Sequence, residues 1–327
     1  MKRLTILLLI LILLFSFPGC GSTEPTATVP SSTPAVTAPS SAPTAASATP
    51  EATPTGPATI STTVPTTVTE TEPAPVIQAP EPDDEDLVRI CDHIPGVQQE
   101  LMYATAENFT GQPIYDFSDA FLRYGTIQKL LAVSEELAKQ GLYLKIWDGF
   151  RPVSAQFALW EVCPDPTYVA DPTRGHSSHS RGNTVDLTLV DADGLELEMP
   201  TCFDDFSARA DRDYSDCTEA AAANALLLQN TMEKHGFQGY YGEWWHFSDT
   251  ESYPVEESFR PVAPSWWYAD CNEYISLRTD PDTSAEVITR IPVGQEFQVL
   301  AIDGDFAWVD FQGVKGYVLR SYTQPVQ

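Results

Sequence analysis

Basic residues are scarce in this sequence. Its 327 residues include 18 Lys and Arg against 46 Asp and Glu, which gives a formal net charge of −28 at pH 7. Nucleic acids and anionic lipid headgroups attract basic surfaces, so this balance disfavours both as partners. A small zwitterionic ligand carries no net charge and is not excluded. The charge therefore predicts no nucleic acid partner and leaves small molecules and peptides as ligands.

No two of the six cysteines stand in a C-x-x-C spacing, so a zinc site built from cysteines is not expected. In an exported protein disulfides are permitted. The cysteines after Cys20 are odd in number, which leaves at least one thiol outside any intrachain pairing. We favour Cys202 with Cys217, which would close a short loop across a polar segment. The full set after Cys20 is Cys91, Cys163, Cys202, Cys217 and Cys271.

An apolar run, Leu4 to Phe17, is shorter than the roughly 20 residues that a membrane-spanning helix needs. It follows the basic head Met1-Lys2-Arg3, as in a secretory signal. The run leads into Gly19-Cys20, which resembles a bacterial lipoprotein signal whose cysteine becomes the lipidated first residue. We expect residues 1–20 to be such a signal and the protein to stand on the extracellular face of the cell membrane, anchored through a lipid on Cys20. Plain signal cleavage or an uncleaved anchor is the alternative.

The segment from Gly21 to about Pro82 consists almost entirely of Thr, Pro, Ala and Ser, and it contains no Lys or Arg. It lacks the large apolar residues whose burial would offset the entropy of ordering it. We expect residues 21–82 to be a disordered tether. A folded domain at its end could then reach away from the membrane.

The folded part begins at about residue 83, and alternating patterns in it predict helices and strands in turn. Apolar positions recur at helical spacing over 118–140, and Thr218 to His235 is a helix between a capping threonine and Gly236. Leu142 to Trp147 and Thr184 to Val190 alternate as strands, and a further strand ending at Phe247 is expected to present Glu243 and His246. Residues 83–262 are therefore predicted to form an α+β domain, a small antiparallel sheet with flanking helices.

Two motifs carry the chemistry of this domain. The first runs from Ser177 to Asp186 and contains His179, and the second is Glu243-Trp244-Trp245-His246. His179, Asp186 and His246 would give Zn²⁺ three N/O ligands and leave a fourth position open, while Glu243 would serve as a base. A single histidine beside two tryptophans is more often a hydrogen-bonded core residue than a ligand. The two motifs together, beside an Asp and a free Glu, favour a zinc hydrolase.

These motifs resemble those of the zinc D-alanyl-D-alanine dipeptidases found in vancomycin-resistance clusters. Two further stretches, Tyr103 to Gly111 and Trp147-Asp148-Gly149-Phe150-Arg151-Pro152, are similar to segments of the same family at matching places. The resemblance covers roughly residues 85 to 255. It implies that one Zn²⁺ is held by His179, Asp186 and His246 and that Glu243 is the catalytic base.

The resemblance also implies roles for four other residues. Arg151 would stabilise the tetrahedral intermediate, or else serve only as a salt bridge that braces its loop. Tyr103, Ser177 and Asp204 would recognise the free ammonium group of the substrate. Asp205 is the neighbour of Asp204 and could be the acting carboxylate instead.

The last sixty residues change to short alternating strands and turns. Their order, including Phe306-Ala307-Trp308-Val309 and Gly313 to Val318, resembles bacterial SH3-like modules. We expect residues 268–327 to form a small all-β SH3-like barrel. Such modules either contact cell-wall peptides or brace a neighbouring domain.

The predicted function is zinc-dependent hydrolysis of D-alanyl-D-alanine to two D-alanine at the cell envelope. One alternative is a D,D-carboxypeptidase that trims the D-Ala end of peptidoglycan stem peptides. Another is a lipoprotein that binds wall peptides without cleaving them. The intact zinc ligands and Glu243 argue against the last of these.

Overall fold

The structure is a computed structural model that describes residues 80–326. The expected signal with Cys20 and nearly all of the expected tether lie outside the described residues. Among the described residues, no helix is both long enough and apolar enough to cross a membrane.

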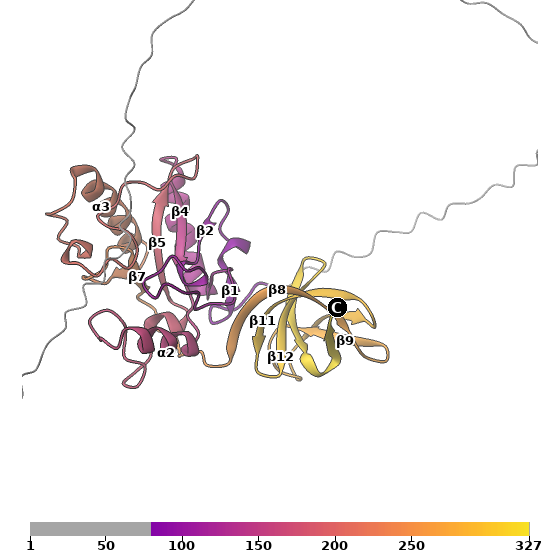
Figure 1. Cartoon of the computed structure of the whole chain (residues 1–327). Helices are drawn as coiled ribbons and strands as arrows, with labels where there is room; N and C mark the ends of the chain where they lie inside the picture. The colour runs from indigo at the N-terminus through magenta and orange to yellow at the C-terminus, as the bar shows by residue number, and fades with distance from the viewer. Residues whose placement is uncertain (1–79, 327) are drawn as a thin grey trace, which may run out of the picture. The chain divides into compact units, whose positions relative to one another are not determined.

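Five strands form the sheet at the centre of the first domain (Figure 1). All neighbouring pairs run antiparallel except β2 with β4, which is parallel. The inner strand β5 is buried along its whole length, so its side chains pack on both faces of the sheet. The five strands lie in the spatial order β2 (Gln98–Gln99), β4 (Tyr143–Asp148), β5 (Thr184–Val190), β7 (His246–Asp249) and β6 (Phe237–Gly239).

Two helices cover this sheet and a third lies apart from them. Helix α1 (Tyr124–Ala138) contacts α3 (Glu219–Lys234) and β4, while α3 contacts β5 and β6. Helix α3 begins where the Thr218 hydroxyl accepts a hydrogen bond from the Ala221 N–H at 3.0 Å. Figure 1 shows α2 (Val153–Val162) away from α3. The predicted α+β class is confirmed.

The first helix starts later than its sequence pattern predicts. Residues 118–120 are irregular, and Phe121–Arg123 is strand β3, which pairs with β1 (Leu87–Arg89). All three residues of β3 are buried, so tertiary packing decides their conformation. The expectation of one helix over 118–140 was therefore wrong in its first turns.

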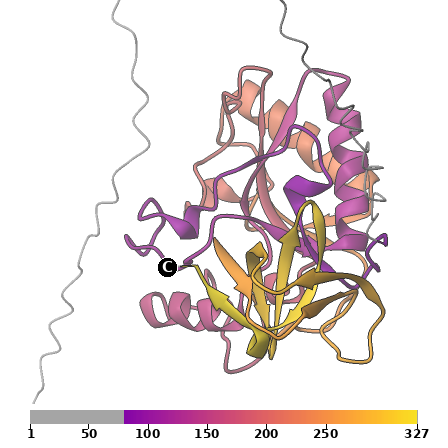
Figure 2. The ribbon, with the colours of Figure 1, turned by 90° about the vertical axis from the view of Figure 1, so that its right-hand side faces the viewer.

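The C-terminal strands form one antiparallel sheet, seen at the front of Figure 2 in yellow. Strand β8 runs without a break across residues 262 to 268, where the sequence predicts the boundary between the domains. The order of the strands is β10 (Val287–Pro292), β9 (Tyr274–Arg278), β13 (Val314–Leu319), β12 (Phe306–Phe311), β11 (Glu296–Asp303), β8 (Phe259–Ala269) and β14 (Thr323–Pro325).

This sheet shares a core with the first domain. Phe121 lies edge-on to Phe259 and Trp308, with ring centroids 5.4 and 5.9 Å apart, respectively. Phe150 also meets Phe259, at 5.8 Å. All four rings are at least nine-tenths buried, so removing one would leave a cavity where the two parts of the chain meet.

The expected disulfide between Cys202 and Cys217 is not formed. Cys217 is a thiol whose sulfur donates to the Tyr214 carbonyl oxygen at 3.4 Å. Tyr214 has a positive φ of 57° in the loop before α3, and this turn gives the thiol an acceptor within its own loop. A short spacing across a polar segment was therefore not sufficient evidence for a disulfide.

Candidate metal and peptide site

His179 lies in a single 3-10 turn, Ser178–Arg181. The Ser177 hydroxyl caps this turn by accepting from the His179 N–H at 3.3 Å. Gly182 ends it with φ +73°, a left-handed conformation that glycine adopts without strain. A Cβ there would lie 2.6 Å from Leu87 Cδ2, so the chain can double back into β5 only with glycine at this position.

Asp186 and His246 are neighbours across two strands. They are direct partners in the antiparallel register of β5 and β7. Side chains of such partners stand on the same face of a sheet, with Cβ atoms about 5 Å apart. Residues that are far apart in the sequence are thus brought together by strand pairing, and the 3-10 turn adds His179 from the side.

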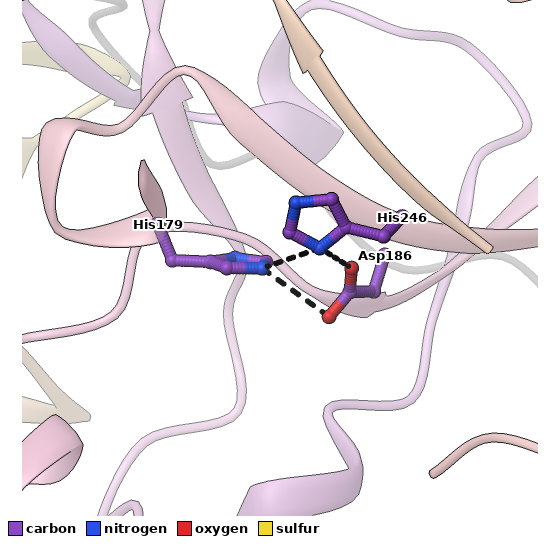
Figure 3. A group of neighbouring side chains, drawn as sticks. All are labelled: His179, Asp186 and His246. Atoms are coloured by element: carbon purple, nitrogen blue, oxygen red, sulfur yellow. Dashed lines mark hydrogen bonds and ion pairs between the residues drawn. The ribbon is translucent and has the colours of Figure 1, made fainter. Parts of the chain in front are cut away.

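The three side chains point toward one another (Figure 3). The distances are 3.3 Å from His179 Nε2 to His246 Nδ1, 3.4 Å from His179 Nε2 to Asp186 Oδ2, and 3.0 Å from His246 Nδ1 to Asp186 Oδ1. A tetrahedral ion with ligands at about 2.0–2.1 Å has ligand–ligand edges of about 3.3–3.4 Å. The triangle therefore has the size of one face of a zinc coordination tetrahedron.

Two details of hydrogen bonding fit an ion at this position. His179 Nδ1 lies 2.8 Å from the Gly149 carbonyl oxygen, which can only accept, so the proton is on Nδ1 and Nε2 is free to act as a ligand. Asp186 Oδ1 is buried and makes no hydrogen bond, although His246 Nδ1 is near it. An orphaned carboxylate oxygen among imidazole nitrogens is what a cation site requires.

The charged groups of the cluster change one another's pKa values. Burial alone would raise the pKa of Asp186, but the two imidazoles hold that pKa below its ordinary value. Burial alone would lower the pKa of His246, but the negative charge of Asp186 has the larger effect. The pKa of His246 is therefore raised. The cluster thus favours the ionised form of Asp186 next to a positive charge. A divalent cation bound there would supply that charge.

Glu243 does not lie on the strand that the sequence predicts for it. Strand β7 begins at His246, and Glu243 lies in the preceding turn, where its carbonyl oxygen accepts from the His246 N–H at 3.4 Å. On an extended strand, Glu243 and His246 would face opposite sides of the sheet because they are three residues apart. The turn allows both side chains to face the same site. Glu243 Oε2 comes within 3.5 Å of His246 Nδ1. Burial raises the pKa of Glu243, which suits a group that must take up a proton.

Arg151 is buried and makes the salt bridge that the sequence left as its alternative role. Its Nε and Nη2 donate to Asp148 Oδ2 at 3.0 and 2.6 Å, and its Nη1 donates to Gln156 Oε1 at 2.8 Å. Its guanidinium also lies 5.0 Å from the centre of the Tyr103 ring. Burial lowers the pKa of Arg151 but Asp148 more than compensates, so this side chain is a fixed cation in the pocket wall.

The three residues expected to recognise an ammonium group all line the same pocket. The Tyr103 hydroxyl donates to Asp204 Oδ2 at 2.9 Å, and Ser177 lies beside His179. Asp204 has a left-handed φ of 56°, an unusual conformation that turns it into the pocket. Asp205 instead accepts from the Ser207 N–H at 2.8 Å, and it is not part of the lining. The structure thus places Asp204, not its neighbour, in the pocket.

The pocket has a volume of about 310 Å³ and contains all eight predicted site residues. Burial raises the pKa of Asp204 well above its ordinary value. At the opening, Tyr240 is 52% exposed and Tyr168 is 40% exposed. A small ligand with one cationic end and a polar bond at the other end would match this distribution of groups.

Sequence reasoning did not assign a role to Asp148. This fully buried carboxylate accepts from the Tyr115 O–H at 2.8 Å and the Gly149 N–H at 2.9 Å, besides holding Arg151. It also lies 3.7 Å from His179 Nδ1. The signal in the sequence was its place in the motif Trp147-Asp148-Gly149-Phe150-Arg151-Pro152, three residues before Arg151.

Comparison with known proteins finds two families that match along the chain. Residues 83–264 match the peptidase M15 family, described as D-Ala-D-Ala dipeptidase, and residues 273–324 match the bacterial SH3 domain. A D-alanyl-D-alanine dipeptidase of Escherichia coli K12 is 41% identical over 175 residues, which cover 53% of this chain and 90% of that protein. One from Enterococcus faecalis is 36% identical over 181 residues, covering 49% and 89%.

Among solved structures, the LD-carboxypeptidase LdcB shows 20% identity with a TM-score of 0.30, covering 52% of this chain and 69% of that one. A score this low supports no comparison of the two sites.

Proposed function

Because the chain belongs to the peptidase M15 family of D-Ala-D-Ala dipeptidases, followed by a bacterial SH3 domain, we propose that it is a zinc-dependent dipeptidase that cleaves D-alanyl-D-alanine into two D-alanine. The observation that carries this proposal is the triangle of His179, Asp186 and His246. Its edges of 3.0 to 3.4 Å match one face of a zinc tetrahedron, and Glu243 stands beside it.

The chain's own residues supply binding and proton transfer. When bound, zinc supplies a Lewis acid that activates water and polarises the peptide carbonyl. Glu243 takes the proton from the attacking water and returns it to the leaving amine. The fixed charge of Arg151, held in place by Asp148, attracts the negative charge that develops on the carbonyl oxygen.

Asp204 favours the free dipeptide over a longer peptide as substrate. It is half-buried in the pocket lining, and its only side-chain hydrogen-bond partner among the described residues is the Tyr103 hydroxyl. A carboxylate that is partly removed from water favours a counter-charge, and the ammonium group of a free dipeptide provides one. In a stem peptide the corresponding nitrogen is a neutral amide, which cannot compensate the carboxylate.

The place of action that we propose is the cell envelope. The signal-like residues 1–20, with Cys20 as the lipid attachment site, support export and anchoring, and the SH3 domain supports contact with the cell wall. The free dipeptide and the stem peptide are the two candidate substrates, so a direct comparison of the two is the decisive assay.

The test offers the zinc-loaded chain both D-alanyl-D-alanine and a pentapeptide stem and measures released D-alanine. We expect D-alanine to be released from the dipeptide and at least tenfold less of it from the pentapeptide. A tenfold difference corresponds to about 1.4 kcal/mol. Asp204→Asn keeps an acceptor for Tyr103 and tolerates the left-handed backbone, so it serves as the matched variant. It should lose this preference. Release from the pentapeptide alone would show a carboxypeptidase, and release from neither would exclude both activities.

A further inference from the structure

A second groove lies between the N-terminal segment of the peptidase domain and the SH3 domain. We call it the junction groove. It has a volume of about 440 Å³ and shares no lining residue with the zinc pocket. One wall comes from residues 80–93, and the other comes from the loop between β9 and β10, from strands β10, β12 and β13, and from the turn between β12 and β13.

The lining is rich in carboxylates that lack a basic partner. Six acidic side chains line the groove, but Lys315 and His93 are its only basic ones. Lys315 is already paired, with its Nζ 3.2 Å from Asp92 Oδ2. The carboxylates without an ion pair in the described part of the chain are Glu81, Asp83, Asp86, Asp280 and Glu286.

Two aromatic side chains in the lining present polar atoms without partners. Trp308 is 5% exposed and Tyr317 is 6% exposed, so both are more than nine-tenths buried. Among the residues that the structure describes, neither the indole N–H nor the phenol O–H makes a hydrogen bond. Neither atom is among the fully enclosed unsatisfied atoms, and both residues line the groove, so these two donors are available to a ligand there. Buried polar groups are rarely left unpaired, which points to a ligand at this position.

The electrostatics of the groove select a cation. Burial, together with the charges of Asp280 and Asp83, raises the pKa of Asp86 to about 6, although a backbone hydrogen bond and Arg123 act the other way. The six carboxylates of the lining would repel an anion, and Lys315 and His93 are the basic residues of the lining that would attract one.

We infer that the junction groove binds a peptide through a side-chain ammonium group. The carboxylates of Asp86, Asp280 and Glu286, which make no ion pair in the described part of the chain, attract this positive charge. The indole N–H of Trp308 and the hydroxyl of Tyr317 are left to bond the carbonyl and amide groups of the peptide. Because the walls are acidic, a peptide whose nearby carboxyl groups are amidated binds better than one in which they are free.

The ligand of the junction groove therefore carries its ammonium group on a side chain. The proposed substrate of the zinc pocket carries its ammonium group on the main chain. Since the two pockets have no residue in common, binding in the groove is independent of whether the chain hydrolyses D-alanyl-D-alanine.

The test uses the complete chain and two probes that differ in one charge. The first is N-acetyl-Ala-Lys-Ala amide, and the second is the same peptide acetylated on the lysine side chain. Calorimetry should show the first probe binding at least tenfold more tightly, with an affinity that falls as salt is added. The indole N–H signal of Trp308 in a nitrogen–proton NMR spectrum should shift with the first probe.

Two variants locate the site. Glu286 is exposed, so Glu286→Gln should leave the fold intact while weakening the lysine peptide about fivefold or more. Glu161→Gln removes an exposed carboxylate on α2 and is the matched control, which should bind as the unaltered chain does. Equal affinity for the two probes, no binding at millimolar concentration, or full affinity in Glu286→Gln would each overturn the inference.

Discussion

Replacing Asp148 by Asn tests how the site holds its buried arginine. The carboxylate of Asp148 receives four hydrogen bonds, two from Arg151 and one each from Tyr115 and Gly149. An amide in its place has one oxygen, so either the arginine or the other two donors lose their acceptor. More importantly, the charge of Arg151 is left buried without a counter-ion.

The expected loss of stability follows from that unpaired charge. Breaking a buried ion pair from one side costs about 3–5 kcal/mol, because the remaining charge stays desolvated. Arg151→Met should also destabilise, since it leaves the Asp148 carboxylate without a cation. The double variant removes both charges. Its loss of unfolding free energy should therefore be smaller than the sum of the two single losses by about 2 kcal/mol or more.

The assay is urea unfolding of the metal-free chain, with a chelator present so that zinc affinity does not enter the comparison. A loss below about 1 kcal/mol in Asp148→Asn would refute this reasoning. So would a double variant whose loss equals the sum, because the two charges would then be independent.

Two further predictions concern neighbouring features. A Cβ on Gly149 would meet the Phe121 carbonyl oxygen at 2.9 Å, so Gly149→Ala should move the carbonyl that holds His179 and weaken zinc binding about tenfold or more in a chelator competition. Unchanged zinc affinity would show that this carbonyl does not orient the imidazole. The pKa of Asp86 is raised to about 6 in the folded chain, from an ordinary value of 3.8, mainly by burial. The ionised Asp86 carboxylate therefore destabilises the folded chain, and this loss of stability is smallest in acid and grows as pH rises through 4 to 6. Asp86→Asn should stabilise the chain at pH 7.5 by roughly 1–2 kcal/mol, since partial exposure screens the charge, and should have no effect at pH 3.5. A pH-independent difference in urea unfolding would contradict this.

The sequence predicted the fold class because periodic burial governs most of the elements. Helix α3 lies where Thr218 and Gly236 delimit it, and β5 covers the predicted residues 184–190. The start of α1 could not be predicted in this way. Phe121 and Leu122 fit a helical pattern locally, but pairing with β1 and packing against Phe259 make them a strand.

The candidate site was recognised in the sequence because its motifs are short and specific, and the structure brings all eight predicted residues to one pocket. What the motifs could not give was the arrangement around them. The turn that carries Glu243, the left-handed backbone of Asp204 and the hydrogen bonds of Asp148 depend on contacts between distant segments. The predicted disulfide is not formed for a local reason, because the Cys217 thiol has a hydrogen-bond acceptor within its own loop.

The junction groove is a feature that no single motif predicts. Its walls come from two segments that are nearly two hundred residues apart, and its chemistry appears only when Trp308 and Tyr317 are seen next to the acidic segment that precedes β1. Surfaces assembled at domain junctions are therefore the part of such a protein for which a structure adds most to the sequence.

The central claim is that Glu243 acts on water beside a zinc ion held by His179, Asp186 and His246. The most direct measurement compares the unaltered chain with Glu243→Ala, recording bound zinc and D-alanine released from D-alanyl-D-alanine in the same samples. The account predicts one zinc per chain in both proteins, and a fall in turnover of at least about a hundredfold in the variant, as expected for loss of a general base. Appreciable turnover by Glu243→Ala, or a chain that releases D-alanine equally well after its zinc has been removed, would contradict it.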